Sequence, residues 1–261
     1  MLTYPQIDPV IFSVGPLAVR WYGLMYLLGF LIAYFVIRAL AAKRNIGLTG
    51  DTLSDLLFYC VLGVILGGRF GYTLFYNFSY YIRHPLEIFA VWEGGMSFHG
   101  GLLGVIVAAS LFCLRRKFPP LLVGDILVTA ASIGLGLGRI GNFINGELWG
   151  RVTDVPWGMV FPGAGPEPRH PSQLYEAFLE GAVLFAVLWW LHSRKAPHGV
   201  PFFSFFALYG GFRVIVEFFR QPDAHLGFLW AGATMGQLLS IPMVLIGVAG
   251  ILYCRRRIIQ P

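Results

Sequence analysis

The stretch WYGLMYLLGFLIAYFVIRAL, residues 21–40, holds a single charged residue, Arg38. About 20 consecutive apolar residues in a helix span the hydrocarbon core of a bilayer. Six further windows of this kind follow, so the sequence predicts seven membrane-spanning helices, near residues 19–40, 55–77, 97–114, 121–139, 174–192, 200–219 and 233–253. With 57% hydrophobic and 12% charged residues, the predicted fold class is an all-α integral membrane protein.

The basic residues between the spans predict the orientation of the chain. Four groups hold 11 of the 19 lysines and arginines: Arg38/Lys43/Arg44, Arg115/Arg116/Lys117, Arg194/Lys195 and Arg255/Arg256/Arg257. With seven spans all four groups fall on one side, which the positive-inside rule makes cytoplasmic. We therefore expect the N-terminus outside and the C-terminus inside. The net charge of +6 is then mainly a topology signal with some attraction to anionic membrane lipids, and no nucleic-acid partner is predicted.

No repeated halves or long linkers divide the chain, so residues 1–261 are expected to form a single membrane domain. The polar, Pro/Gly-rich stretch at about 150–172 is large enough for a small external cap. Glycines and alanines spaced by four on the second, third and fourth spans predict close helix packing. The three cysteines lack metal or redox spacing, and no nucleotide loop, HExxH or serine elbow occurs, so neither metal nor cofactor is expected.

Seven charged residues lie in or at the edges of the predicted spans: Arg69, Arg139, Glu147, Arg151, Arg213, Glu217 and Arg220. Charge at membrane depth is costly and generally marks a functional site. Arginine suits a phosphate because its planar guanidinium stays charged and donates two parallel hydrogen bonds. The pattern predicts a site that holds an anionic lipid headgroup and could stabilise a departing phosphate.

The densest polar segment is GRIGNFINGELWGR, residues 138–151. Its glycines predict that the fourth helix ends or loosens here. Non-helical backbone at membrane depth is tolerated where it is buried in protein or lines a polar cavity. The segment is therefore either a ligand site or a helix end tied by hydrogen bonds to the cap, and its arginines, asparagines and glutamate favour the site.

The sixth span carries a polar stripe within LYGGFRVIVEFFRQPD, residues 208–223. Tyr209, Arg213, Glu217 and Arg220 follow at i, i+4, i+8 and i+11, within an arc of roughly 80° on a helix. Arg213 and Glu217 are placed to pair along this stripe. A self-satisfied ion pair is the alternative to a ligand site, and the second arginine-rich segment favours the site.

Two single positions and one further segment complete the candidates. His99, between glycines at the start of the third span, could transfer protons near neutral pH or serve as a structural hydrogen-bonding group. The segment RHPSQLYEA, residues 169–177, is either part of the site or a helix start with Ser172 as possible N-cap and Glu176 near the first turn, and its pattern, including His170, favours the structural interpretation. Tyr22 fits an aromatic interface belt and could also lie against the headgroup.

Five segments together resemble the bacterial prolipoprotein diacylglyceryl transferases: GGRFGYTLFYN (67–77), MSFHGG (96–101), GRIGNFINGELWGR (138–151), HPSQLYE (170–176) and YGGFRVIVEFFRQPD (209–223). The resemblance implies a seven-helix enzyme of the bacterial inner membrane with its active site towards the periplasm. It implies transfer of the sn-1,2-diacylglyceryl group of phosphatidylglycerol to the lipobox cysteine of a preprolipoprotein. A thioether forms and glycerol phosphate leaves, which explains why the chain brings no nucleophile.

The resemblance also carries roles onto individual residues. It implies that Arg139 and Arg213 bind the phosphate and stabilise it as it departs. The other phosphatidylglycerol-binding positions that it implies are Tyr22, Asn142, Glu147, Gly150, Tyr209 and Glu217. Among the catalytic residues, His99 is expected to be the general base for the substrate thiol, or else to position lipid while the arginines activate the sulfur. The implied partners are phosphatidylglycerol, lipobox-bearing signal peptides and membrane lipids.

A phospholipid or anion transporter is the main alternative, because its buried arginines would bind the same headgroup without chemistry. Many transporters show internal pseudo-symmetry, which this sequence lacks. A structural scaffold does not account for so many embedded charges.

Overall fold

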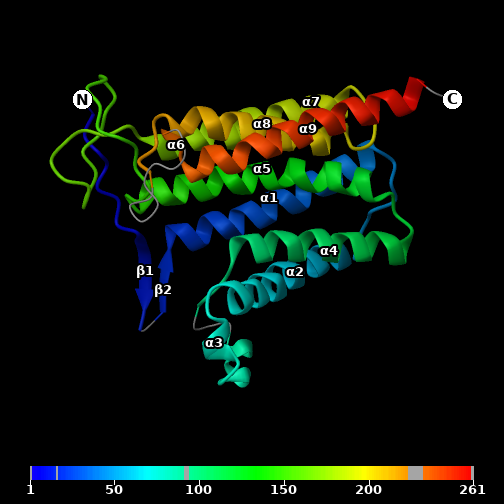
Figure 1. Ribbon diagram of the computed structural model, residues 1–261, viewed down its shortest axis with the longest axis horizontal. Helices are drawn as coiled ribbons and strands as arrows, with labels where there is room; N and C mark the ends of the chain where they lie inside the picture. The colour runs from blue at the N-terminus through cyan, green and yellow to red at the C-terminus, as the bar shows by residue number, and fades with distance from the viewer. Residues whose placement is uncertain (1, 16, 91–93, 223–231, 260–261) are drawn as a thin grey trace. The chain divides into compact units, whose positions relative to one another are not determined.

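The computed structural model describes residues 2–15, 17–90, 94–222 and 232–259 of the chain (Figure 1). Its contacts define two compact units, the first formed by Met1–Arg44 with Asp125–Pro261 and the second by Asn45–Gly124. Among the described residues, seven helices are long and apolar enough to cross a membrane. This confirms the predicted all-α membrane fold with seven spans, whereas the orientation stays a prediction.

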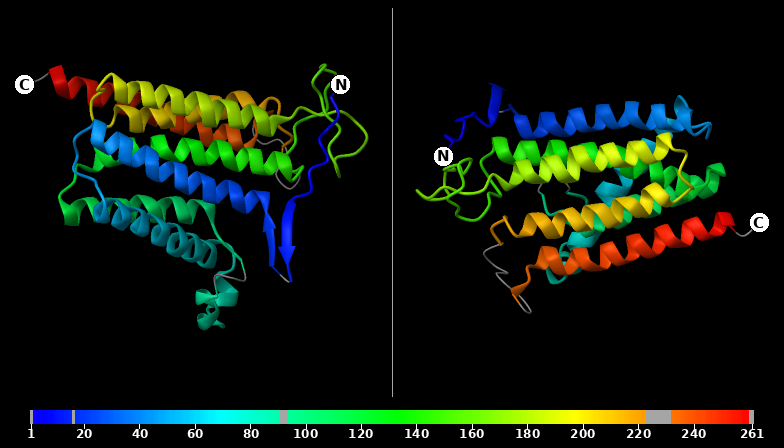
Figure 2. Two further views of the ribbon diagram at one scale, coloured as in Figure 1. Left: turned by 180° about the vertical axis from the view of Figure 1, so that it is seen from behind. Right: turned by 90° about the horizontal axis from the view of Figure 1, so that it is seen from above.

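Five of the seven spans belong wholly or mostly to the first unit. They are α1 (Trp21–Lys43), α5 (Pro120–Ile144), a composite span of α6 (Ser172–Glu176), the π-helical η3 (Ala177–Val183) and α7 (Leu184–Ser193), then α8 (Val200–Glu217) and α9 (Met235–Ile259). Figure 2 shows these helices running side by side. Large apolar side chains such as Leu27 and Phe30 on α1 stay exposed, as expected for a surface that faces lipid.

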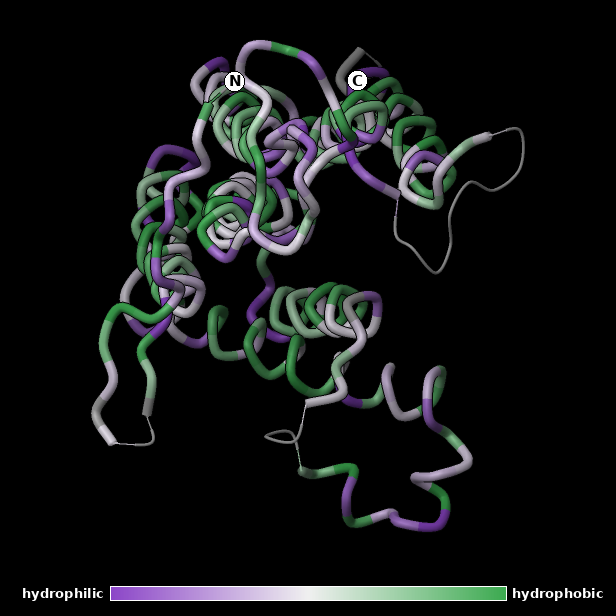
Figure 3. The backbone as a smooth tube through the Cα atoms, turned by 90° about the vertical axis from the view of Figure 1, so that its left-hand side faces the viewer, coloured by the Kyte–Doolittle hydropathy of each residue, from purple (hydrophilic) through white to green (hydrophobic). Residues whose placement is uncertain are grey.

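In Figure 3, hydrophobic residues lie along the helices and hydrophilic residues are frequent in the connections.

The fourth predicted span extends further than expected. Its helix passes through Gly141 and ends at Ile144, shortly before Gly146 adopts a φ of +66°. One glycine within a helix costs only about 1 kcal/mol, so the turn at Gly146, not Gly141, marks the end.

A backbone contact between α5 and the fifth span positions the charged residues. A Cβ atom on Gly181 would lie 2.6 Å from the Cα atom of Gly136, so only glycine allows the two helices to come this close. Arg139 lies about one turn after Gly136 on α5, and Glu180 lies next to Gly181 in η3. The close approach therefore brings an arginine and a glutamate of different spans together. Single-turn π segments inside α-helices often occur at functional sites.

Asp125 of α5 holds the first turn of α8. Its fully buried carboxylate accepts hydrogen bonds from the backbone N–H groups of Gly199, at 2.9 Å, and Phe202, at 2.8 Å. The N-terminal N–H groups of a helix have no partner within the helix, and a carboxylate there also interacts favourably with the helix dipole. This contact therefore fixes α8, and with it the polar stripe at the other end of the helix.

Replacing Asp125 with alanine is expected to destabilise the protein by about 2–4 kcal/mol, because two buried donors lose their acceptor. Unfolding by increasing SDS, followed by circular dichroism, measures the change. Asp55→Ala is the matched control, since Asp55 forms an exposed ion pair with Arg116 at 2.6 Å; such pairs contribute about 1 kcal/mol or less. Equal losses for the two variants would contradict the role assigned to Asp125.

The second unit contains α2 (Asp51–Phe75), α3 (Phe78–Tyr81), η1 (Pro85–Phe89) and α4 (Phe98–Arg116). The glycines of α2 and α4 meet, with a Cβ atom on Gly71 falling 2.8 Å from the Cα atom of Gly100. This confirms the close packing that the small-residue spacing predicts for the second and third spans.

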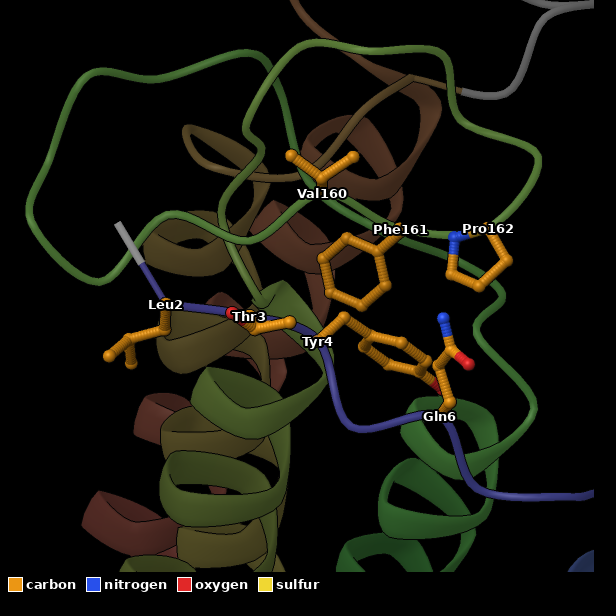
Figure 4. Close-up of a pocket in the computed structure, with 7 residues that line it drawn as sticks. All are labelled: Leu2, Thr3, Tyr4, Gln6, Val160, Phe161 and Pro162. Atoms are coloured by element: carbon orange, nitrogen blue, oxygen red, sulfur yellow. The ribbon is translucent and has the colours of Figure 1, made fainter.

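Two features of the first unit lie outside the helices. Residues Val10–Val14 and Leu17–Arg20 form an antiparallel hairpin, β1 and β2, which the sequence analysis did not predict. The expected cap at 150–172 is an irregular segment joined by isolated bridges, including Val152 with Arg169. Its position on the periplasmic side stays a prediction. A cavity of about 540 Å³ lies between this segment and the N-terminal arm (Figure 4), lined by Leu2, Thr3, Tyr4, Gln6, Val160, Phe161 and Pro162.

Candidate functional site

Three arginines and three glutamates from α5, the fifth span and the C-terminal end of α8 form one ion-pair cluster. Its members are Arg139, Arg213, Arg220, Glu176, Glu180 and Glu217. All of them lie at the end of the first unit where α5 and α8 end and the fifth span begins. We call this group the arginine–glutamate cluster.

Glu176 is the centre of the arginine–glutamate cluster. Its Oε2 atom lies 2.5 Å from the Nε atom of Arg139, and its Oε1 atom lies 3.2 Å from the Nη1 atom of Arg213. The Nε atom of Arg220 lies 3.7 Å from the same Oε1 atom. A single oxyanion thus contacts three guanidinium groups, which defines a geometry suited to binding negative charge.

Glu217 also contacts the guanidinium of Arg213. Its Oε1 atom lies 2.6 Å from the Nη2 atom of Arg213, an i to i+4 pair along α8. Its Oε2 atom accepts a hydrogen bond of 2.7 Å from the hydroxyl of Thr234, just before α9. The pairing that the polar stripe predicts is therefore present, and the pair is not isolated, because Glu176 shares the same arginine.

The arginines of the cluster are more exposed than its glutamates. The side chains of Arg139, Arg213 and Arg220 retain 20%, 12% and 12% of their accessible surface, whereas those of the three glutamates retain at most 2%. The carboxylates are thus enclosed, while each arginine keeps an open side. A ligand that reaches this place meets positive charge first.

A second polar chain connects α1 with the segment after α5. The Nδ2 atoms of Asn142 and Asn145 donate to the Oε1 atom of Glu147 at 2.8 and 3.2 Å. Tyr22 packs over Gly141, and its hydroxyl lies 3.2 Å from that of Tyr26. The structure therefore brings together the predicted residues Tyr22, Asn142 and Glu147.

Tyr209 lies on α8 one turn before Arg213, and its hydroxyl interacts electrostatically with Glu180 and Arg213. Tyr209 therefore belongs to the surroundings of the arginine–glutamate cluster, as the stripe on the sixth span predicts.

Gly150 and Arg151 connect the cap with the end of α8 through their backbone and side-chain donors. The N–H of Gly150 donates to the carbonyl of His170, and the N–H of Arg151 donates to that of Phe219, both at 2.8 Å. The Arg151 guanidinium donates to the carbonyls of Glu217 and Arg220 at 3.1 and 2.9 Å, where the free carbonyls of a helix end need donors. These contacts are structural, and binding of lipid by Gly150 stays a prediction.

Arg69, another of the charged residues in the predicted spans, contacts backbone carbonyls and no carboxylate in the described part of the chain. Its buried guanidinium donates to backbone carbonyls, including those of Glu87 and Gly94, both at 2.5 Å, and that of Ile88 at 2.7 Å. Arg69 instead ties the segment after α2 to its own helix within the second unit. His99 lies in the same unit, exposed in the first turn of α4, and its catalytic role stays a prediction.

The segment before the fifth span differs from its interpretation in one respect. Pro171, not Ser172, is the N-cap of α6, and the hydroxyl of Ser172 donates to the carbonyl of Leu148 at 3.2 Å. His170 packs against Tyr175 and Phe219, and burial lowers the pKa of its imidazole from the ordinary value. This environment supports the structural interpretation of His170.

Glu176 and Glu180 are the residues that the sequence analysis missed. The sequence pattern places Glu176 in a helix start, and Glu180 is not among the predicted site residues. Both lie four residues apart inside an otherwise apolar window, the signal that identified the charges of the other spans. Applying that rule to every glutamate in a span would have found them.

A family model described as prolipoprotein diacylglyceryl transferase matches residues 9–253. A phosphatidylglycerol–prolipoprotein diacylglyceryl transferase of Geobacter sulfurreducens is 58% identical over 260 residues, covering 100% of both chains. Proteins of the same name from Pseudoalteromonas translucida and Bordetella parapertussis are each 56% identical, covering 99% and 98% of this chain and 97% and 98% of their own. The five motifs, the seven spans and these matches agree, and the chain belongs to the prolipoprotein diacylglyceryl transferase family.

Proposed function

We propose that this chain transfers the sn-1,2-diacylglyceryl group of phosphatidylglycerol to the lipobox cysteine thiol of preprolipoproteins, forming a thioether and releasing glycerol phosphate. The observation that carries the proposal is the convergence of Arg139 and Arg213, from two different spans, on the carboxylate of Glu176. Two guanidiniums held around one oxyanion are also placed to share the oxygens of one phosphate.

The arginines act in two stages. They first bind the phosphodiester of the lipid through the sides that remain exposed. As the bond between the glyceryl carbon and the phosphate oxygen breaks, negative charge grows on that oxygen. Fixed cationic donors stabilise this growing charge in the transition state more than they stabilise the charge of the bound lipid. The activation barrier of the transfer is therefore lowered.

The remaining assigned residues orient the lipid around this pair. Tyr22, Asn142 and Glu147 form the polar chain at the end of α5, and Tyr209 and Glu217 lie beside Arg213. We assign these five side chains to phosphatidylglycerol binding, to which Gly150 contributes by holding the cap against the residues that follow α8. Glu147 orients polar groups and does not move a proton.

The attacking sulfur belongs to the lipoprotein substrate, and a thiolate attacks faster than a thiol. We assign removal of the thiol proton to His99, because imidazole exchanges protons near neutral pH. The alternative role of His99 is to position lipid while the arginines favour the thiolate. Its bacterial relatives favour the bacterial inner membrane as its location, and the basic loops favour an orientation with the N-terminus and the cap on the periplasmic side.

Purified protein in detergent, supplied with phosphatidylglycerol and a lipobox peptide, tests the proposal. Release of glycerol phosphate that depends on the peptide cysteine, together with a diacylglyceryl increase in peptide mass, is the expected result. No covalent change, combined with lipid movement between the leaflets of liposomes, would indicate the transporter instead.

Replacing His99 with glutamine is expected to slow the transfer by about 10²- to 10⁴-fold if the imidazole is the general base. The rate of His99→Gln should then recover as pH rises, because hydroxide and the ionising thiol replace the base. An unchanged pH profile combined with a weaker apparent affinity for lipid would assign His99 to lipid positioning. His84→Gln is the control, since His84 is an exposed histidine of the same unit.

A further inference from the structure

Glu180 is the least satisfied member of the arginine–glutamate cluster. Its side chain is fully buried, and neither oxygen accepts a hydrogen bond from any donor in the described part of the chain. Its closest cations are the Nη2 atom of Arg139 at 3.8 Å and the Nη1 atom of Arg213 at 3.9 Å. A buried carboxylate without hydrogen bonds is costly in its charged form.

The charged groups around Glu180 come from all the elements packed against it. Arg139 lies on α5, Arg213 and Tyr209 lie on α8, Arg220 follows α8, and Glu176 precedes Glu180 in its own span. With every carboxylate ionised, three arginines and three glutamates carry no net charge. The cluster is therefore already neutral before a ligand arrives.

A phosphodiester brings one negative charge into this neutral environment. An excess charge is unfavourable where the dielectric is low, and uptake of one proton by a carboxylate restores neutrality. Glu176 and Glu217 each hold arginine contacts of 2.5–2.6 Å that a proton would weaken. Glu180 has no comparable contact to lose, so it is the carboxylate that protonates at the smallest cost.

We propose that Glu180 takes up a proton when the phosphate of the lipid binds beside Arg139 and Arg213, and releases it when the site empties. The inference rests on the proposed assignment of these two arginines to the phosphate. Glu180 acts through the arginines and does not touch the lipid, so it is a positioning residue that sets their charge balance.

The proposal predicts a specific pH dependence of lipid binding. If lipid binding takes up one proton, the affinity for lipid falls with rising pH. The fall is tenfold for each pH unit above the pH at which Glu180 of the lipid-free protein loses its proton. At lower pH the carboxyl is already protonated and affinity is constant. In Glu180→Gln the side chain is always neutral, so the affinity for lipid should no longer depend on this group.

The experiment uses the full-length protein in detergent and dihexanoyl phosphatidylglycerol as the probe, without peptide, so that no transfer occurs. The phosphodiester stays a monoanion from about pH 6 to about pH 9, so proton uptake comes from the protein. Titration calorimetry in two buffers of different ionisation enthalpy gives the number of protons bound with the lipid. The wild-type protein is expected to take up close to one proton within this range, and Glu180→Gln close to none.

The affinity of Glu180→Gln for the probe distinguishes a changed charge balance from a misfolded site. Glu180→Gln should bind the probe as well as wild type at low pH and at least tenfold more tightly at high pH, whereas a misfolded site would bind weakly throughout. Glu167→Gln is the control, because it removes an exposed carboxylate of the cap and should keep the wild-type uptake.

Three outcomes are distinguishable. Binding of the probe by wild type without proton uptake would overturn the inference and leave the phosphate assignment intact. Uptake that persists in Glu180→Gln would also overturn it, whether or not that variant is fully stable. If Arg139→Lys and Arg213→Lys bind the probe as tightly as wild type, the phosphate assignment itself fails.

Discussion

Arg213→Ala is expected to reduce diacylglyceryl transfer by at least about 10³-fold, and Arg139→Ala by a similar factor. Removing one preorganised donor to a developing oxyanion typically costs about 10²- to 10³-fold. Here each arginine also helps to bind the lipid phosphate, so both kcat and the apparent affinity should fall. The measurement is the rate of glycerol phosphate release at saturating lipobox peptide, over a range of phosphatidylglycerol concentrations.

These substitutions also leave buried carboxylates without a partner. Arg213 contacts Glu176, Glu180 and Glu217, so its removal should destabilise the protein by about 3–5 kcal/mol. Loss of activity alone would therefore not distinguish catalysis from folding. The double variant Arg213→Ala/Glu180→Gln restores the charge balance without changing a residue assigned to lipid contact, and it should recover much of the stability.

Transfer should remain lost in the double variant, because the phosphate still lacks one of its two guanidiniums. Arg213→Lys gives a complementary test, since lysine keeps the charge but not the planar pair of donors. We expect it to retain a small part of the activity. A double variant with full stability and near wild-type transfer would contradict the role of Arg213.

The seven spans could be predicted from sequence because lipid imposes a simple rule on composition. Apolar windows give the helices, but they give neither the exact ends, as where α5 continues to Ile144, nor the π-helical segment within the fifth span. The hairpin formed by β1 and β2 was missed because its two apolar runs, VIFSV and LAVR, are only five and four residues long and lead directly into the first apolar window, so they show no period of their own.

The site could be predicted in part. Charge inside apolar windows identified Arg139, Arg213 and Glu217, but it could not separate Arg213 from Arg69, which is also an arginine in a span. The difference lies in their partners, since Arg69 contacts backbone carbonyls and Arg213 contacts carboxylates. Such contacts depend on which distant segments of the chain lie together in the fold. A single sequence does not show this.

Gly150→Ala is expected to reduce transfer strongly through the fold, not through lost contact with lipid. A Cβ atom at this position would lie 2.5 Å from the carbonyl oxygen of Phe219 and 2.6 Å from that of His170. Both neighbours are backbone atoms joined by hydrogen bonds, so neither can move independently. The added methyl group must therefore separate the cap from the end of α8.

That separation would move the residues that follow α8. Arg151 would lose its bonds to the carbonyls of Glu217 and Arg220, which hold the last turn of the helix beside the arginine–glutamate cluster. We expect a loss of stability of about 1–3 kcal/mol, the usual range for overpacking a tight site. Transfer should fall by at least about 10²-fold, since a displacement of 1 Å at a catalytic group costs this much.

Unfolding in SDS and the transfer assay, applied to the same preparations, separate the two interpretations of Gly150. Gly211→Ala is the matched control, because no atom of the described residues lies within 4 Å of a Cβ atom at that position of α8. It should keep wild-type stability or exceed it, since alanine favours a helix over glycine by about 1 kcal/mol. If Gly150→Ala kept full stability and lost only lipid affinity, the backbone of Gly150 would be a direct lipid contact and the structural explanation would be wrong.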